Sequence, residues 1–411
     1  MVPKLRFKEF CGEWEENRLG EAVEYITDYV AAGSFADIRK NVTYLEKGYA
    51  QLIRTIDLKN NFKNKGFIYV DKHAFEYLYR VNLNEESIVL PNIGANIGES
   101  YYINCDKLPH QYNVLAPNSI LLKSKMQNNR FIYQFLKTDL FVNRLKLIVA
   151  ASGQPKFNKT DLKKLKLQVP SLSEQTKVAD FLSTVDDKIQ NQQDKISHLE
   201  NIKKGFMQKI FSRKIRFKDD GGEEFPEWEE KKLGDFLIKY DEITVKNNQY
   251  PPLTSSRKGI FLQKDYFNNR QIASEDNTGY NIVPFGYFTY RHMSDDAVFY
   301  FNINDLVEYG IVSTLYPVFT TTKKMNSIFL QYYLNESTTF KKYCILQKQG
   351  GSRTYMYFNK LKQFIMEIPC LKEQQKIADF LSLFDEKIST EKETLEHLKQ
   401  LKKGLLQQMF V

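Results

Sequence analysis

Cysteine, tryptophan and long apolar runs are all scarce in this sequence. Its 411 residues include four cysteines and two tryptophans. The cysteines form neither a C-x-x-C pair nor the spacing of a zinc site, so we expect reduced thiols and no metal (Cys11, Cys105, Cys344, Cys370). No segment approaches the about 20 apolar residues of a membrane span, and the N-terminus lacks the apolar core of a signal peptide. These absences predict a cytoplasmic protein that does not enter a membrane.

Motifs for nucleotide hydrolysis and for nucleophilic catalysis are absent as well. There is no G-x-x-x-x-G-K-[ST], no G-x-G-x-x-G and no G-x-S-x-G sequence. Gly94 and Gly98 lack the spacing and the lysine of a phosphate-binding loop, and are typical of a turn. The only Pro-Pro pair, at 251–252, lacks the flanking residues of a base-methylating motif, and the five histidines are dispersed. The sequence therefore predicts no catalytic residue and no bound cofactor, and we expect a protein that is not an enzyme.

The charge balance points to an anionic partner. The chain has 59 lysines and arginines against 50 aspartates and glutamates, which gives a net charge of +9. Nucleic acid is the first candidate for such a partner. Because many basic proteins are merely soluble, charge alone does not decide the question.

The most informative feature is a block of sequence that occurs twice. Residues 169–212 align without a gap with residues 368–411, and 20 of the 44 aligned residues are identical. A shorter repeat, here called the leading motif, begins at Arg6 and again at Arg216: each Arg-Phe-Lys is followed by Glu-Trp and then by Leu-Gly. The chain is thus a tandem duplication. Each half consists of a leading motif, a long variable segment and the repeated block.

The repeated blocks have the pattern of long helices. Apolar residues recur at heptad spacing, and neither block contains an internal proline. Pro170 and Pro369 stand just before the blocks, and the residue before a proline is biased away from helix. Ser171-x-x-Glu174 has the spacing of a capping box. The residues that we expect to pair the helices, or to contact partner helices, are Val178, Phe181, Leu182, Val185, Ile189, Ile196, Leu199 and Phe206 in the first block and Ile377, Phe380, Leu381, Phe384, Ile388, Leu395, Leu398 and Leu405 in the second.

Two further features of the blocks leave alternatives open. Gln192 and Glu391 interrupt the apolar seam at equivalent positions, where they either fix the register of pairing or occupy a solvated gap. Lys203-Lys204-Gly205 recurs as Lys402-Lys403-Gly404. The lysines suit the dipole of a helix C-terminus, and the glycine either is tolerated or permits close approach of a partner helix.

The length of the predicted helices and the order of the segments suggest how they pair. A helix of about 38 residues is roughly 55–60 Å long, and its apolar stripe must be covered, most simply by the other copy. The first variable segment enters the first helix at its N-terminus, and the second variable segment leaves from its C-terminus. We therefore expect antiparallel pairing, with one variable segment at each end and a circular, pseudo-twofold arrangement.

The variable segments, roughly 20–168 and 234–367, have the pattern of mixed α/β domains. Short runs of β-branched and aromatic residues predict strands at 49–56, 66–70, 87–91, 286–290, 297–301 and 310–314. Longer periodic stretches predict helices at 131–147 and 325–344.

Both copies of the block carry the pattern P-x-L-x-E-Q-x-K-[VI]-A-D-F-L-S followed by D-x-K-I. With this pattern the whole chain resembles the specificity subunits of Type I restriction-modification systems. The resemblance implies two α/β (α+β) target-recognition domains separated by two long antiparallel coiled-coil helices. It divides the chain into a first recognition domain (1–168), a first conserved helix (169–212), a second recognition domain (213–367) and a second conserved helix (368–411).

The same resemblance implies a function. Each domain would recognise one half of a split target in double-stranded DNA, while the helices set the spacing and dock two methylation subunits. Restriction or motor subunits would then join. S-adenosylmethionine, ATP and Mg would all bind to those partner subunits rather than to this chain.

The residues that contact bases are predicted from their chemistry. Arginine fits guanine and asparagine or glutamine fits adenine with two hydrogen bonds each, and basic side chains contact phosphates. Polar residues of these types, in or beside turn-like segments, are Arg54, Thr55, Lys59, Asn92, Asn96, Gln154 and Lys156 in the first domain and Ser256, Arg257, Lys258, Arg291, Arg353 and Tyr355 in the second. Each of them is alternatively a solvated or structural polar residue.

Two other functions remain open at this point. A duplicated coiled-coil scaffold, whose variable domains bind proteins rather than DNA, explains the repeat but not the basic charge. A restriction enzyme that has lost its catalytic half has no support from any motif.

Overall fold

The computed structural model describes residues 2–94, 96–150, 155–268, 273–348 and 353–411. The chain forms two compact units. The first unit comprises Met1–Gln193 and Glu393–Val411, and the second comprises Asp194–Lys392. Each unit therefore contains one variable segment together with part of both repeated blocks. Among the described residues, no helix is both long and apolar enough to cross a membrane.

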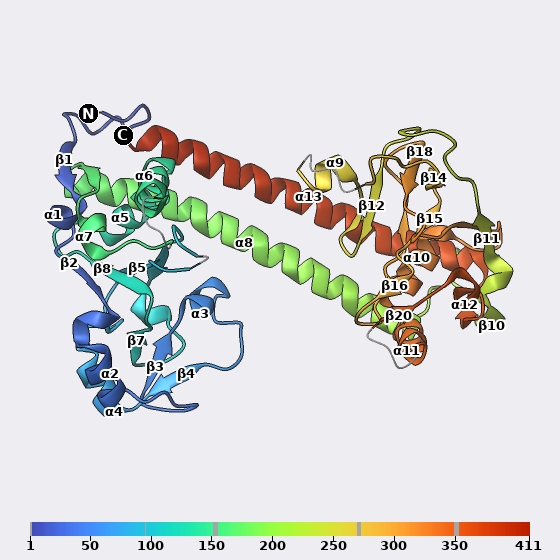
Figure 1. Ribbon diagram of the computed structural model, residues 1–411, viewed down its shortest axis with the longest axis horizontal. Coiled ribbons are helices and arrows are strands. Elements are labelled where there is room, and N and C mark those ends of the chain that lie inside the picture. The colour runs from blue at the N-terminus through green and yellow to red at the C-terminus, as the bar shows by residue number, and fades with distance from the viewer. Residues whose placement is uncertain (1, 95, 151–154, 269–272, 349–352) are drawn as a thin grey trace. The chain divides into compact units, whose positions relative to one another are not determined.

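The two repeated blocks are long helices, as the heptad pattern predicts. Helix α8 spans Leu172–Phe211, and helix α13 spans Leu371–Met409 (green and red in Figure 1). Each begins at the second residue after a proline, Pro170 or Pro369. The predicted capping box forms only in part. Ser171 Oγ accepts the backbone N–H of Glu174 at 3.4 Å, but the carboxylate of Glu174 contacts more distant residues, described below.

Within each unit the two helices pack antiparallel. In the second unit Lys195 contacts Glu391 at 2.6 Å, and Lys203 contacts Asp385 at 2.5 Å, so the residue number rises on one helix as it falls on the other. In the first unit Lys402 of α13 pairs with Asp186 of α8, and Leu406, further along α13, shares an apolar cluster with Leu182, nearer the start of α8. Antiparallel pairing thus holds in both units, whereas the coiled-coil packing and the circular, pseudo-twofold arrangement stay predictions. The first lysine of each Lys-Lys-Gly repeat, Lys203 or Lys402, forms its ion pair with the other helix rather than with the C-terminus of its own helix.

Half of the 16 residues predicted to form the seam are buried. Val178, Leu182, Val185, Ile196 and Leu199 of α8 are at most 9 % exposed. In α13, Ile377, Leu381 and Ile388 are at most 6 % exposed. Phe206, Phe380 and Phe384 are partly exposed and pack together, with ring centroids 5.1–5.8 Å apart. Four other seam positions are partly exposed, namely Ile189, Leu395, Leu398 and Leu405. Phe181 is 38% exposed and so lies on the helix surface.

The first variable segment forms two sheets with short helices around them. The larger has the strand order β2-β8-β5-β6, and the smaller has the order β4-β3-β7. The strands are β2 (Tyr25–Asp28), β3 (Ala50–Ile53), β4 (Ile68–Val70), β5 (Ser87–Pro91), β6 (Tyr101–Ile103), β7 (Asn113–Leu115) and β8 (Ser119–Lys123). The helices are α1 (Leu19–Ala22), α2 (Phe35–Asn41), α3 (Thr55–Lys59), α4 (Lys72–Tyr77), α5 (Asn129–Phe135), α6 (Asp139–Ala150) and α7 (Lys159–Lys163).

In its described residues, the second variable segment has one four-stranded sheet and three two-stranded ones. The four-stranded order is β11-β19-β15-β17, and the pairs are β12-β13, β14-β18 and β16-β20. The strands are β11 (Leu237–Tyr240), β12 (Leu253–Ser256), β13 (Gly259–Leu262), β14 (Asn281–Pro284), β15 (Phe288–Thr289), β16 (Met293–Ser294), β17 (Asn302–Ile303), β18 (Tyr309–Val312), β19 (Val318–Thr321) and β20 (Thr354–Tyr355). The helices are α9 (Gln263–Tyr266), α10 (Ser327–Glu336), α11 (Thr338–Leu346) and α12 (Phe358–Leu361).

The leading motif closes each variable segment in the same way. Strand β1 (Glu15–Arg18) pairs antiparallel with β9 (Lys166–Val169), and β10 (Glu229–Lys232) pairs antiparallel with β21 (Ile365–Ile368). The repeated Leu-Gly pair follows each first strand. A Cβ on Gly20 would lie 2.8 Å from Cβ of Lys163, and a Cβ on Gly234 would lie 2.8 Å from the carbonyl oxygen of Lys362. Glycine is therefore required at both positions by close packing.

Several sequence-based boundaries were wrong. The predicted strand 49–56 ends at Ile53, because Arg54 caps helix α3. Both long predicted helices break in two, at Thr138 and at Ser337, whose hydroxyls accept backbone N–H groups of the helix that follows. The segment 297–301 is not a strand, although Phe299 and Phe301 are buried in the core. The apolar pattern that suggested these elements reflects burial rather than regular hydrogen bonding.

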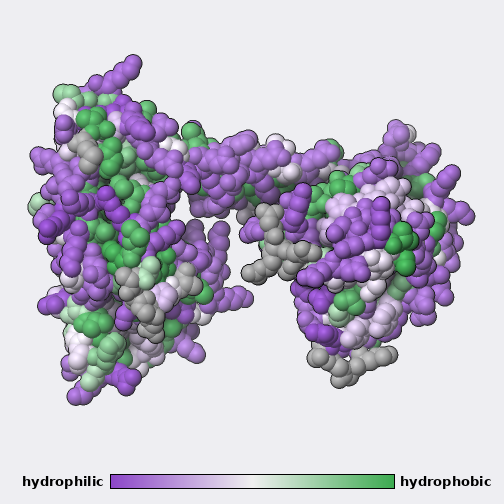
Figure 2. All heavy atoms as spheres, turned by 45° about the horizontal axis from the view of Figure 1, so that its top comes forward, coloured by the Kyte–Doolittle hydropathy of each residue, from purple (hydrophilic) through white to green (hydrophobic). Residues whose placement is uncertain are grey.

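Apolar side chains fill the interior of each unit. The core of the first unit includes Trp14, Phe131 and Phe410, and that of the second includes Trp228, Phe319 and Phe329. The face drawn in Figure 2 is mostly hydrophilic, with smaller hydrophobic groups between. The core residues from α8 and α13 belong to the same clusters, so each variable segment packs directly on the helices.

Candidate nucleic-acid interface

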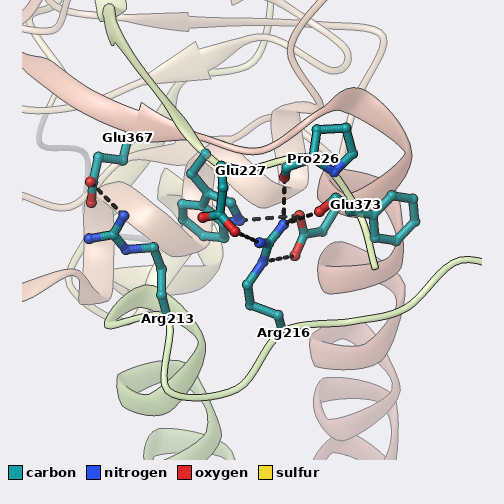
Figure 3. Close-up of polar contacts among 8 residues, drawn as sticks. Arg213, Arg216, Pro226, Glu227, Glu367 and Glu373 are labelled. Carbon is teal, nitrogen blue, oxygen red and sulfur yellow. Dashed lines mark hydrogen bonds and ion pairs between the residues drawn. The ribbon is translucent and has the colours of Figure 1, made fainter. Parts of the chain in front are cut away.

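A buried glutamate joins the leading motif to the start of the long helix in the second unit. Arg216 donates from Nε and Nη2 to the carboxylate of Glu373, at 3.3 and 3.0 Å, and from Nη1 to Glu227 at 2.8 Å (Figure 3). Trp228 Nε1 donates to the same Glu373 carboxylate at 3.1 Å. The Glu373 side chain is 0 % exposed, so its charge depends on these donors. We call this arrangement the Arg–Glu–Trp clamp.

The first unit contains the same clamp. Arg6 donates from Nε and Nη2 to the two carboxylate oxygens of Glu174, both at 2.8 Å, and Trp14 Nε1 donates to Glu174 at 3.2 Å. Glu174 is 2 % exposed. The phenylalanine of the leading motif adds an aromatic contact in each unit, Phe7 on Phe181 and Phe217 on Phe380. These contacts explain why arginine, tryptophan and glutamate recur in both halves.

The glutamine that follows each clamp glutamate holds the variable segment. Gln175 Oε1 accepts the backbone N–H of Asn128 at 3.0 Å, and Gln374 Oε1 accepts that of Asn326 at 2.8 Å. Asn128 and Asn326 cap helices α5 and α10. Each glutamine is 1 % exposed. The Glu-Gln pair of the repeated pattern therefore fixes both the leading motif and one helix of the variable segment, α5 in the first unit and α10 in the second.

Four of the six residues predicted to bind DNA in the second domain surround one cavity. This cavity has a volume of about 410 Å³, and its lining includes Ser256, Arg257, Lys258 and Arg291. Ser256 and Lys258 belong to the turn of the β12-β13 hairpin, in which Ser256 Oγ accepts the N–H of Lys258 at 3.1 Å. Arg257 Nη2 contacts Asp296 at 2.5 Å. The cavity is thus lined by both cations and carboxylates.

The other two predicted residues reach the same area through strand β20. Thr354 and Tyr355 pair with Ser294 and Met293 of β16, strands that lie side by side in Figure 1. This pairing brings Arg353 to Asp295, with Nε and Oδ1 3.0 Å apart. Tyr355 stacks on Tyr357, with ring centroids 5.7 Å apart. The structure therefore brings together all six residues, whose contacts with DNA stay predictions.

The residues predicted in the first domain are more dispersed. Arg54 donates from Nε and Nη2 to Asp57, whose side chain is 0 % exposed, and from Nη2 to the carbonyl of Gly66. Although burial opposes ionisation, the bonds from Arg54 hold the pKa of Asp57 below its ordinary value. Thr55 Oγ1 lies 3.4 Å from Ser119 Oγ. The side chains of Arg54 and Thr55 therefore stabilise the fold around α3.

The remaining first-domain candidates form two pairs. Lys59 Nζ lies 2.9 Å from both Asn96 Oδ1 and Glu99 Oε1, on the surface. Asn92 donates to the carbonyl of Phe157 at 3.1 Å, and it lines, with Lys156, a cavity of about 640 Å³. Gln154 lies outside the described residues. Direct DNA contact by any of these residues stays a prediction.

Sequence reasoning did not single out Asp295 and Asp296. They hold two of the predicted arginines, and their only signal is a pair of consecutive acidic residues four and five positions after Arg291. Within the described ranges, no group of three His, Cys, Asp or Glu side chains is placed to hold a metal ion.

The comparison with known families agrees with the duplication. The Type I restriction modification DNA specificity domain matches residues 12–201 and again residues 226–400. The chain belongs to this family. Because it carries two copies of the specificity domain, it is a DNA-recognition subunit of the Type I restriction-modification class rather than a catalytic one.

Relatives and solved structures match this chain over nearly its whole length. The specificity subunit of the type I restriction enzyme MjaVIII of Methanocaldococcus jannaschii is 24% identical, covering 97% of this chain and 94% of that protein. The putative MjaX specificity subunit of the same organism is 25% identical, covering 98% and 94%. The crystal structure of the S subunit from M. genitalium shares the fold, with a TM-score of 0.53, 15% identity and coverage of 100% and 99%. A chain from a study of complex assembly in the type I R-M system has a TM-score of 0.54, 13% identity and 97% coverage of both chains.

Proposed function

We propose that each half of this specificity subunit recognises one half of a split target in double-stranded DNA. The observation that carries the proposal is the repeated clamp. The same buried glutamate and glutamine hold two variable domains that differ in sheet order and in surface residues. Recognition of two unequal half-sites requires two domains with different surfaces. The repeated clamp attaches such domains to the helices in the same way.

The proposed domains keep the sequence-based boundaries. The recognition domains are 1–168 and 213–367, and the conserved helices are 169–212 and 368–411. A helix of 40 residues is about 60 Å long, and the grooves of B-DNA repeat about every 34 Å. The helices would thus set the distance between the two half-sites, while basic side chains supply phosphate contacts that position the protein without specifying sequence.

The proposed partners are two methylation subunits, followed by restriction or motor subunits. Equivalent leucines near the start of each long helix, Leu172 and Leu371, are 56% and 46% exposed. Leu383 and Leu401 are also exposed on α13. Exposed apolar residues on a helix are suited to a protein contact, and the repeat offers such a contact twice. S-adenosylmethionine, ATP and Mg would bind to those partners, and the complex would act in the cytoplasm.

The proposal is tested by mapping methylated adenines across a genome after co-expression of this chain with its methylation subunits. We expect a motif with two short specified ends around an unspecified gap of constant length. A stable complex that produces no motif would support the scaffold function instead and would overturn the proposal.

A further inference from the structure

The second recognition domain contains cations of two kinds around its cavity. Arg257 and Arg353 are each paired with an aspartate, Asp296 at 2.5 Å and Asp295 at 3.0 Å. Lys258 and Arg291 also surround the cavity, but their side chains form no hydrogen bond or ion pair with any other described residue. This difference in pairing suggests a difference in role.

Of the two aspartates, Asp296 is held in place by neighbouring groups, whereas Asp295 is 79% exposed and pairs with Arg353 at the surface. Asp296 Oδ1 accepts from Ser294 Oγ at 2.8 Å and from the N–H of Val298 at 3.3 Å. Ser294 is only 8% exposed, and it belongs to strand β16. Arg257 is therefore anchored to a fixed carboxylate, although its own side chain is 57% exposed. The Arg353 side chain is similarly accessible, at 52%.

A carboxylate beside a guanidinium changes which part of DNA the guanidinium binds favourably. Next to a phosphate, the carboxylate would repel the backbone charge and weaken the contact. Against a base edge there is no such repulsion, and the guanidinium keeps further N–H donors for the O6 and N7 acceptors of guanine. The carboxylate itself is an acceptor for the amino group of cytosine, the base paired with guanine. Holding the arginine in advance also lowers the conformational entropy lost on binding.

We propose that Arg257 and Arg353, each held by its aspartate, recognise guanine in the half-site of the second domain, while Lys258 and Arg291 contact phosphates. This inference rests on the proposed function and names the base that one recognition surface selects. The two roles differ in what they predict. Loss of a base contact changes preference at one position, whereas loss of a phosphate contact weakens binding to all sequences alike.

The test uses the complex with its methylation subunits and compares five variants, four at the cations and one at Asp296. Arg257→Lys and Arg353→Lys keep the charge but lose the forked donors. Lys258→Gln and Arg291→Gln are matched controls on the same cavity. Adenine methylation is mapped across the genome, and binding to a duplex carrying the motif is measured by fluorescence anisotropy over a range of salt concentrations.

We expect the half-site of the second domain to contain guanine. Arg257→Lys or Arg353→Lys should reduce methylation about ten- to hundredfold at sites with that guanine and relax the preference there, with the first half-site unchanged. Lys258→Gln and Arg291→Gln should leave the motif intact and each lower the slope of log K against log salt by about 1. Asp296→Asn should relax the same position as Arg257→Lys, because the arginine is no longer held.

The outcomes distinguish failure of the guanine assignment from failure of the proposed function. A split motif whose second half contains no guanine, or a uniform loss in the arginine variants, would overturn this inference alone. An unaltered complex that gives no split motif would overturn the proposed function as well. Methylation that still requires the first half-site in each variant shows that the altered complex is assembled.

Discussion

The two units share one clamp but differ in the surroundings of the ion pair that joins their helices. In the first unit Asp186 contacts Lys402 and accepts from Gln134 Nε2 at 2.8 Å, and Lys137 lies close by, 4.2 Å from the ring centroid of Tyr133. At the equivalent place in the second unit, Asp385 contacts Lys203 and the hydroxyl of Tyr332.

This difference shows which contacts the duplication maintained. Every member of the clamp lies in a repeated part of the sequence, whereas Gln134, Lys137 and Tyr332 belong to the variable segments. Burial, and then the positive charge of Lys137, lower the pKa of Lys402 to about 8. Lys402 and Lys137 in turn hold the pKa of Asp186 below its ordinary value despite its burial. The repeated parts hold the domains alike, while each domain modifies the helix pair beneath it.

The clamp should give the largest effect on stability. We expect Glu373→Gln to lower the free energy of unfolding of the second unit by about 3 kcal/mol, because it leaves Arg216 largely buried without its carboxylate. Glu174→Gln should do the same in the first unit. The chain has only two tryptophans, one in each clamp, so urea unfolding followed by fluorescence in a Trp14→Phe or a Trp228→Phe background reports on one unit at a time.

Figure 3 offers a matched control for this experiment. Glu227 contacts the same arginine, but its side chain is 82% exposed. Glu227→Gln should therefore cost less than about 1 kcal/mol. Equal losses for Glu227→Gln and Glu373→Gln would show that burial of the clamp glutamate is not what matters.

Removal of the carboxylate from the two cross-helix ion pairs should lower the stability of the two units unequally. Asp186→Asn leaves two partly or fully buried lysines without a carboxylate, so we expect a loss of about 3 kcal/mol in the first unit. Asp385 is 51% exposed, and Asp385→Asn should cost about 1 kcal/mol or less. The same fluorescence assay measures both losses of stability, and a larger loss for Asp385→Asn than for Asp186→Asn would contradict this expectation.

Removal of the capping hydroxyl should destabilise the two helix breaks, α5–α6 and α10–α11, to the same extent. Thr138→Ala and Ser337→Ala each remove a hydroxyl that accepts backbone N–H groups at a helix start, and each should cost about 1 kcal/mol. Thr339→Ala, on an exposed neighbour of Ser337, serves as the control and should cost less. If Ser337→Ala and Thr339→Ala were indistinguishable, the cap at Ser337 would not be the cause of the break.

The smallest effect should be that of Lys137→Met, which we expect to reduce, but not remove, a pH dependence in the stability of the first unit. The pKa of Lys402 is about 8 in the folded chain and about 10.4 in an unfolded one. Between these values the folded state binds fewer protons, so stability should rise with pH. Lys137→Met removes one of the causes and should flatten this rise, while burial, the larger cause, remains. An unchanged pH profile in Lys137→Met would mean that the two lysines do not interact.

The long helices and the family were predictable from the sequence because their signals are local and repeated. The heptad pattern and the prolines at 170 and 369 mark both helices correctly. The role of Glu174 was not predictable in this way. Its spacing from Ser171 suggests a local cap, but its partner Arg6 lies 168 residues away. A charged residue that has a plausible local partner gives no sign of a distant one.

The recognition surface was predictable only in part, for a related reason. Residue chemistry identified Arg257 and Arg353, but their pairing with Asp296 and Asp295 depends on β16 lying beside β20. In the first domain, chemistry alone did not distinguish Arg54, which is held by a buried aspartate, from the more exposed Lys59. Side-chain type identifies candidates, whereas the fold determines which of them are available to a ligand.

Exchange of one variable segment tests whether the repeated clamp and helices present two independent recognition surfaces. Residues 20–168 are replaced by the corresponding segment of another specificity subunit, with the Arg–Glu–Trp clamp and both long helices kept. Methylated adenines are then mapped in the complex with its methylation subunits. The account predicts that one half of the split motif changes while the other half and the gap length stay as they were. A change in both halves would contradict it.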